Sequence, residues 1–129
     1  MPSTAATVPP KEAAISFLTL ASAGKVREAY DRFIGPGFRH HNPYFPADAA
    51  SLAAAMEQNA SENPGKVIEP IHVLGDGDLV AVHARVRLKP GGKDIAICHL
   101  YRFAEGRIIE LWDIAQPEPD QSPNQNGMF

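Results

Sequence analysis

The hydrophobic pattern of the chain changes its period near Lys66, and this change limits the folds that the chain can adopt. Before Lys66, apolar residues recur every three to four positions, as in Val26, Ala29, Tyr30 and Phe33, which is typical of an amphipathic helix. After Lys66, apolar and polar residues alternate, which is typical of strands with one buried face. Helices followed by strands predict an α+β fold in which helices pack on one face of an antiparallel sheet.

Proline, glycine and capping residues set the expected limits of three helices. The helices are expected over residues 10–24, 26–34 and 48–63, with Pro10 in a first turn, Gly35-Pro36-Gly37 as a stop and Asp48 as a cap. The segment 38–46 combines two histidines, three aromatic residues and two prolines. We expect this segment to be an ordered loop.

Four strands in two hairpins are expected after Lys66. The first hairpin is expected to turn at Asp76-Gly77, and the second at residues 104–106, where glycine suits a three-residue loop. That loop would place His99 and Asp113 on one face, one diagonal apart on neighbouring strands. A two-residue turn would instead place them on opposite faces.

The composition fits one soluble domain. The chain has 129 residues, of which 44% are hydrophobic and 21% charged, and its net charge is −3. We expect a flexible N-terminus over 1–9, one domain over 10–116 and an exposed tail over 117–129. Lysine and arginine are scattered, so neither nucleic acid nor a membrane surface is an expected partner. The start lacks a signal-peptide pattern, and no segment has the ~20 apolar residues of a membrane span, which predicts a cytoplasmic protein.

Several short motifs resemble those of a known family. They are Gly24-Lys25 with Arg27-Glu28-Ala29, His41-Asn42-Pro43, the stretch Gly77 to His83, Tyr101-Arg102-Phe103 with Gly106 to Asp113, and the closing Asn126-Gly127-Met128-Phe129. In these motifs, from about Pro10 onward, the chain resembles the SnoaL-like family of polyketide-cyclase or aldol-condensation proteins, within the nuclear-transport-factor-like superfamily. The resemblance implies a cone-shaped roll: three N-terminal helices packed on a strongly curved, mainly antiparallel sheet, with a cavity at the open end. It also implies a homodimer through the convex side.

His99 and Asp113 are the candidate catalytic residues. A carboxylate beside an imidazole can fix the tautomer of the ring and hold its pKa near working pH, as acid/base catalysis requires. We expect an apolar pocket to raise the pKa of the aspartate as well. The resemblance implies an acidic catalytic residue at Asp113 and a polar partner at His99, where many members carry aspartate. The alternative is a buried histidine that only satisfies the carboxylate.

Five further residues are candidates for substrate binding, and Trp112 is a candidate for the dimer interface. The binding candidates are His41, Asn42, His83, Tyr101 and Tyr30. Asn42 has an alternative role, as a turn residue whose side chain bonds its own backbone. Trp112 is expected on the outer face of the sheet, opposite Asp113, with Ile108, Glu110 and Ile114. We expect no cofactor and no metal, because the histidines and the single cysteine, Cys98, form no recognisable ligand motif.

These residues favour a lyase or isomerase that acts on a small carbonyl compound by acid/base catalysis in an enclosed pocket. The alternative is a non-catalytic protein of the same fold that binds a small apolar molecule. An epoxide hydrolase ranks last, because the Asp-Arg-Asp arrangement that it needs is missing around His99 and Leu111.

Overall fold

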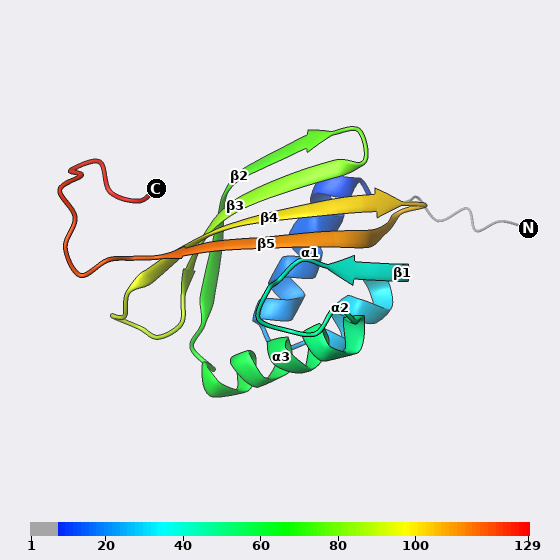
Figure 1. Cartoon of the computed structure of the whole chain (residues 1–129), viewed down its shortest axis with the longest axis horizontal. Helices are drawn as coiled ribbons and strands as arrows, with labels where there is room; N and C mark the ends of the chain where they lie inside the picture. The colour runs from blue at the N-terminus through cyan, green and yellow to red at the C-terminus, as the bar shows by residue number, and fades with distance from the viewer. Residues whose placement is uncertain (1–7) are drawn as a thin grey trace, which may run out of the picture.

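In the computed structural model, which describes residues 8–129, three helices cover one face of a curved five-stranded sheet (Figure 1). The elements are α1 (Pro10–Ser22), α2 (Val26–Phe33), β1 (Ile34–His40), α3 (Ala49–Glu62), β2 (Val67–Asp76), β3 (Leu79–Arg87), β4 (Asp94–Ala104) and β5 (Arg107–Pro117). The sheet order is β1-β5-β4-β3-β2, and all pairs except the parallel β1–β5 pair are antiparallel. The α+β fold and its mainly antiparallel sheet are therefore confirmed.

The three helices form where their sequence signals predict. Proline occupies the first turn of α1, where its missing N–H costs no hydrogen bond. The side chain of Asp48 caps α3, since its Oδ2 accepts a hydrogen bond of 2.8 Å from the Ser51 backbone N–H. The inner sides of α1 and α2 supply buried alanines and aromatic rings to the core.

The structure corrects the loop expected over 38–46, because residues Ile34–His40 form the edge strand β1. This strand pairs with β5 through Arg39 opposite Glu110 and His40 opposite Leu111. Its Gly-Pro-Gly sequence looks like a turn, yet an edge strand tolerates proline because one side of the strand needs no ladder hydrogen bonds. Gly35 is required for the pairing: a Cβ there would lie 3.0 Å from the Cβ of Arg107.

The first hairpin turns one residue later than expected, at Gly77-Asp78, so that Asp76 pairs with Leu79. This turn places His72 directly opposite His83, and a register shift follows between His72 and Pro70. Their rings stack with centroids 5.2 Å apart, on the face of the sheet that points away from the helices. The shared face predicted for these two histidines is confirmed.

The second hairpin corrects the expected turn, because Ala104 pairs directly with Arg107 and leaves a two-residue turn. Glu105 and Gly106 both adopt positive φ, at 51° and 80°, as the tightest hairpin turns require. A register shift follows between Phe103, which pairs with Ile108, and Arg102, which pairs with Glu110. This bulge adds one residue to β5, which reverses the alternation and returns His99 and Asp113 to one face.

The bulge also moves Ile108, which was expected on the outer face with Trp112. Ile108 is fully buried and belongs to the same core as Leu111, because the extra residue lies between them. Tyr101 and Phe17 are the largest of the fully buried side chains, and they join α1 to the middle of β4. The core therefore lies between the helices and the inner face of β3, β4 and β5.

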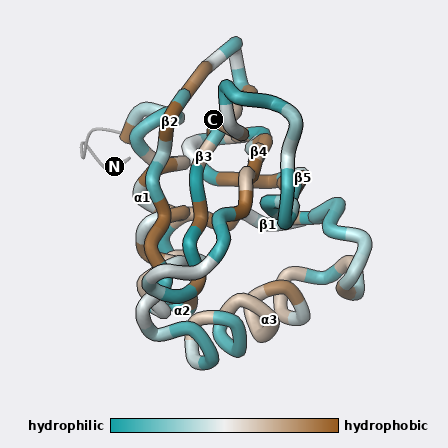
Figure 2. The backbone as a smooth tube through the Cα atoms, turned by 90° about the vertical axis from the view of Figure 1, so that its left-hand side faces the viewer, coloured by the Kyte–Doolittle hydropathy of each residue, from teal (hydrophilic) through white to brown (hydrophobic). Residues whose placement is uncertain are grey.

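The C-terminal segment returns along the outer face of the sheet. After β5, the Glu118 backbone N–H donates to the Asp94 carbonyl at 2.9 Å, and Lys93 forms an ion pair with Asp120. The ring of Phe129 lies 4.3 Å from the Arg85 guanidinium carbon. Figure 2 shows that this segment is largely hydrophilic up to its last residues.

Two sequence predictions concern the chain ends and the compartment. Residues 1–7 of the expected N-terminal segment lie outside the described residues. Within residues 8–129, no helix is both long and apolar enough to span a bilayer. The cytoplasmic location of the protein stays a prediction.

Candidate active site

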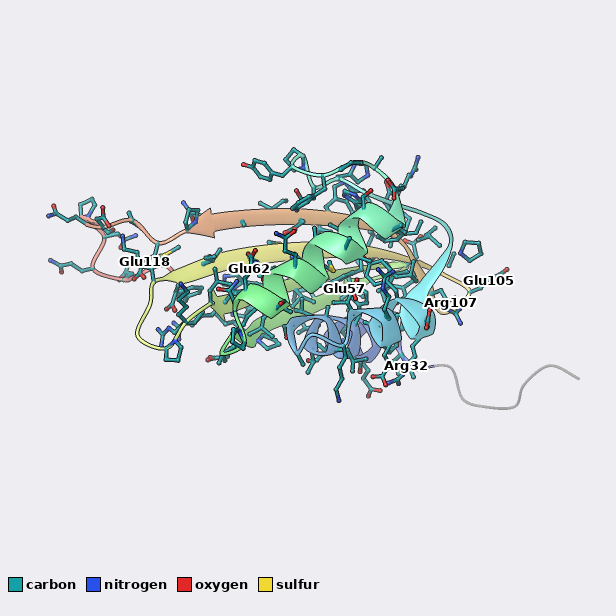
Figure 3. The ribbon with its side chains drawn as sticks, turned by 90° about the horizontal axis from the view of Figure 1, so that it is seen from below. Arg32, Glu57, Glu62, Glu105, Arg107 and Glu118 are labelled. Carbon is teal, nitrogen blue, oxygen red and sulfur yellow. The ribbon has the colours of Figure 1, made fainter. Side chains whose placement is uncertain are left out.

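A cavity of about 280 Å³ lies between α3, the end of α1 and the inner face of the sheet. Figure 3 shows α3 crossing this face, with Glu57 and Glu62 along the helix. Twelve of the eighteen lining residues are apolar, and the six polar ones are Ser22, Asn42, Asn59, Lys66, His99 and Asp113. A mainly apolar cavity with a few convergent polar groups is typical of a small-molecule site.

His99 and Asp113 meet on the cavity wall, directly opposite each other on β4 and β5. The His99 Nε2 atom lies 2.9 Å from Asp113 Oδ1, and the Asp113 side chain is 22% exposed. On the other side of the ring, the Tyr101 hydroxyl lies 2.9 Å from His99 Nδ1. Burial raises the pKa of Tyr101, so the hydroxyl keeps its proton at neutral pH. Its contact with Nδ1 and the contact of Asp113 with Nε2 fix the orientation of the imidazole ring.

Asn42 holds the second oxygen of the Asp113 carboxylate. Its Nδ2 donates to Asp113 Oδ2 at 2.8 Å, while its Oδ1 accepts from the Tyr44 backbone N–H at 3.0 Å. The sequence suggested either a turn residue or a site residue at Asn42, and this side chain does both: its oxygen stabilises the turn and its nitrogen holds Asp113. The loop after β1 is held against β5 by this amide, and the carboxylate is fixed by two donors.

The structure reverses the expected direction of the Asp113 pKa shift. Burial alone would raise the pKa of this carboxyl, but several neighbours together more than offset it. These are the hydrogen bond and the charge of His99, the hydrogen bond of Asn42 and the positive charge of Lys66. The pKa of Asp113 therefore lies below its ordinary value, and the side chain is a carboxylate at neutral pH.

The other candidate binding residues are divided between the core and the outer face. Tyr101 lies behind His99, and the Tyr30 hydroxyl donates to the Met56 sulfur at 3.6 Å, behind the cavity wall. His41 and His83 are absent from the cavity lining, and His83 lies on the outer face beside His72. Three of the seven predicted site residues, His99, Asp113 and Asn42, therefore lie together on the cavity wall. His41 and His83 do not reach the cavity.

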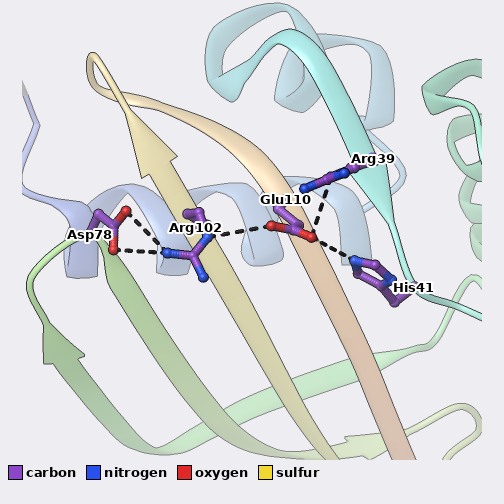
Figure 4. Close-up of polar contacts among 5 residues, drawn as sticks. All are labelled: Arg39, His41, Asp78, Arg102 and Glu110. Carbon is purple, nitrogen blue, oxygen red and sulfur yellow. Dashed lines mark hydrogen bonds and ion pairs between the residues drawn. The ribbon is translucent and has the colours of Figure 1, made fainter.

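His41 belongs to a charged network on the outer face, which Figure 4 shows. Its Nε2 lies 2.7 Å from Glu110 Oε2, and Arg39 and Arg102 each lie 3.4 Å from the same carboxylate. The hydrogen bond from His41 holds the pKa of Glu110 below its ordinary value, and Arg39 adds to this effect. His41 also stacks on Trp112 with ring centroids 5.0 Å apart. These contacts hold the loop after β1 against β5.

Lys66, Asn59 and Ser22 line the cavity although sequence reasoning did not select them. Lys66 follows the Asn-Pro-Gly turn after α3 and precedes the first residue of β2, where the alternation begins. Its Nζ donates to Asn59 Oδ1 at 2.8 Å. The sequence signal was a lysine at the start of an amphipathic strand, which more often points to solvent.

Within residues 8–129, no three His, Cys, Asp or Glu side chains come close enough together to hold a metal ion. The cavity therefore offers one carboxylate, one imidazole, two amides, one hydroxyl and one ammonium. This set can accept a proton from a carbon acid, donate hydrogen bonds to an oxygen and attract a negative charge.

Comparisons with known proteins agree with this fold. The SnoaL-like domain family matches residues 14–111. IdmH from Streptomyces antibioticus, a candidate polyketide cyclase, has a similar fold, with a TM-score of 0.69 at 20% identity over 84% of this chain and 93% of its own. A candidate isomerase of the SnoaL-like family from Agrobacterium tumefaciens has a TM-score of 0.68 at 16% identity over 83% and 97% of the two chains.

A candidate ketosteroid isomerase from Kribbella flavida is also similar, with a TM-score of 0.68 at 15% identity over 90% of this chain and 84% of its own. The curated proteins give no significant match. At these identities the solved structures show the fold alone, whereas the family match spans most of the sequence, including the three helices and most of the sheet. The chain belongs to the SnoaL-like domain family.

Proposed function

We propose that the protein is a lyase or isomerase that removes a proton from the carbon beside a carbonyl group, with Asp113 as the base. The observation that carries the proposal is the Asp113 carboxylate, which faces the cavity and is held by His99 and Asn42 at 2.9 and 2.8 Å. A base fixed in this way needs no reorientation before it reacts. His99 and Tyr101 act as positioning residues behind it.

The lowered pKa of Asp113 limits the substrates that it can deprotonate. A weak base removes a proton efficiently only when the carbon acid is itself fairly acidic. Carbons between two carbonyl groups, as in a β-diketone or β-keto ester, meet this condition. The C–H bond breaks, the proton moves to Asp113, and the electron pair moves onto a carbonyl oxygen. The second N–H of the Asn42 amide can donate to that oxygen.

The enolate then has two outcomes in a mainly apolar cavity. Return of the proton to a different carbon gives an isomer. Attack of the enolate carbon on a second carbonyl of the same molecule forms a C–C bond and closes a ring, with the proton passing to the new alkoxide. The cyclase and isomerase descriptions of the solved relatives support both outcomes as the reaction class.

The pH dependence of proton exchange tests the role of Asp113. Ethyl benzoylacetate exchanges its C2 protons in D2O, which NMR follows after subtraction of the uncatalysed rate. We expect kcat/KM to stay constant from neutral pH downward and to fall only below about 3.9, the ordinary aspartate pKa. The sign follows from the carboxylate, because only the ionised form accepts a proton. The stability that Asp113 contributes is lost over the same range, as pH falls through its lowered pKa, so circular dichroism must show folded protein at each point. A midpoint above about 5 would exclude Asp113 as the base.

The alternative function, binding without chemistry, has the apolar lining of the cavity in its favour. Under this alternative, ethyl benzoylacetate binds and shifts protein NMR signals, while its C2 protons exchange at the uncatalysed rate. An epoxide hydrolase is less well supported, since the lining residues within 8–129 include one carboxylate and no arginine.

We also propose that two copies associate through the outer face of the sheet. Leu74 and Ile114 are exposed there by 67% and 58%, on the same face as Trp112 and Leu100, and large apolar side chains exposed on one face favour association. Ile114→Glu is expected to convert a dimer to a monomer in size-exclusion chromatography with light scattering, because it buries a charge in the interface. Tyr44→Glu, in the exposed loop after β1, serves as the control and is expected to stay dimeric. A monomeric wild-type protein at micromolar concentration contradicts the proposal.

A further inference from the structure

Lys66 places a positive charge in the wall of the cavity. The residue stands between α3 and β2, and its side chain lines the cavity together with Asn59 and Ser22. Its ammonium donates a hydrogen bond of 2.8 Å to Asn59 Oδ1, so the head group is held in one position. The apolar stem of a lysine covers hydrophobic surface well, which suits a lining that also contains Ile68 and Leu88.

This ammonium has no carboxylate partner among the described residues. Ion pairs within 8–129 engage other cations, such as Arg27, Arg87 and Arg102, but none includes Lys66. Burial lowers the pKa of Lys66, and the negative charge of Asp113 opposes this shift only in part. A half-buried ammonium whose hydrogen bond goes to a neutral amide has lost water and keeps only the Asp113 charge, beyond ion-pair distance, as compensation.

Two rows of side chains across the sheet mark the two ends of the cavity. Ile68, Val86 and Ile95 form one row across three strands, next to Lys66. The row that holds His99 and Asp113 lies four residues further along β4, about 13 Å away by the rise of a strand. Apolar side chains line the space between the two rows, so one molecule can reach both ends of the cavity.

We propose that Lys66 binds a carboxylate group of the ligand, so that the cavity takes a carboxylic acid with an apolar body and a carbonyl group toward Asp113. A carboxylate matches one ammonium beside amide and hydroxyl donors, Asn59 and Ser22. A phosphate is a poorer match, since it carries more charge and the lining within the described residues contains no arginine. The carbonyl end of this assignment rests on the proposed function, whereas the carboxylate end does not.

A matched pair of probes tests the carboxylate site. The acid 4-oxo-4-phenylbutanoate and its methyl ester differ in the charge and in one methyl group, and titration calorimetry measures the affinity of each at pH 7. We expect the wild-type protein to bind the acid about tenfold more tightly than the ester. Lys66→Met keeps an unbranched apolar stem of nearly the same length and removes the charge, so this preference is expected to disappear. Lys25→Met, on the exposed segment before α2, is the matched control and is expected to keep it.

The pH profile gives a second readout that a structural role would not produce. Because burial lowers the pKa of Lys66, the preference for the acid is expected to fade at a pH below about 10.4, the ordinary lysine pKa. Equal affinities of the wild-type protein for acid and ester would overturn the proposal. So would a Lys66→Met variant that is folded by circular dichroism and keeps the preference.

The two proposals can fail separately. Equal affinity for acid and ester together with catalysed exchange of ethyl benzoylacetate contradicts the carboxylate site alone. A clear preference for the acid, lost in Lys66→Met, together with uncatalysed exchange contradicts only the assignment of Asp113 as a base and supports the carboxylate site.

Discussion

Replacing Asp113 by asparagine is expected to lower kcat/KM for the C2 proton exchange of ethyl benzoylacetate by about 10²–10⁴-fold. Asparagine has nearly the same shape, and its oxygen can still accept the hydrogen bond that His99 makes at 2.9 Å, whereas its NH2 group loses the hydrogen bond from Asn42. It cannot accept a proton from a carbon acid at neutral pH. The loss is therefore expected in kcat, while KM changes little, because the cavity keeps its shape.

Asp78→Asn is the matched control for this experiment. Asp78 is an aspartate on the outer side of the first hairpin, where it pairs with Arg102 at 3.2 Å, remote from the cavity lining (Figure 4). The same change of charge there is expected to leave the exchange rate at the wild-type value. A folded Asp113→Asn variant with wild-type exchange would remove Asp113 from the chemistry, and the binding alternative would then gain support.

Phe17→Ala is expected to reduce the free energy of unfolding by about 3–5 kcal/mol. Phe17 is 1% exposed on α1, and its ring lies 5.6 Å from that of Tyr30 and 6.0 Å from that of Tyr101. Truncation removes apolar area from the core and leaves a cavity that the two tyrosines can fill only in part. Equilibrium unfolding in urea, followed by circular dichroism, measures the loss.

Phe17→Leu is the conservative control, and it is expected to cost clearly less because it leaves a smaller cavity. The truncation also reaches the active site, since Tyr101 packs on Phe17 and is hydrogen-bonded to His99. The folded fraction of Phe17→Ala is therefore expected to show slower proton exchange than the wild type. A stability loss under about 1 kcal/mol would mean that neighbouring side chains fill the space left by Phe17, and it would contradict the close packing of this part of the core.

The helices and hairpins could be predicted from the sequence because each has a local signal. Pro10 and Asp48 mark two helix starts, and alternation marks the strands of both hairpins. Strand β1 could not be predicted in the same way. It is an edge strand held by a parallel partner more than 70 residues away along the chain, and its Gly-Pro-Gly sequence carries the local signature of a turn.

The shared face of His99 and Asp113 was predicted for a reason that proved wrong. The expected three-residue loop is a two-residue turn, and the bulge between Arg102 and Phe103 supplies the missing shift. Ile108 and Ile109 are both apolar, so the change of alternation leaves no mark in the hydrophobic pattern of β5. A bulge is detected only when the pairing of both strands is known.

The sequence predicted which residue types form the site, but not the direction of the Asp113 pKa shift. An aspartate in an apolar cavity was expected to have a raised pKa, because burial is the effect that sequence reasoning can anticipate. The opposite shift arises first from His99 and then from Asn42 and Lys66, which act on Asp113 from a loop and from the residue before another strand. Such partners are set by tertiary packing, and no local spacing reveals them.

The position of Phe129 has a practical consequence for protein production. The last residue lies against Arg85 and stacks near His83, so the chain ends on the outer face of the sheet. An affinity tag fused after Phe129 would begin on this surface and compete with whatever covers it. Tagged and tag-free proteins are therefore expected to differ in oligomeric state even when no residue is substituted. Light-scattering experiments should use a cleavable tag.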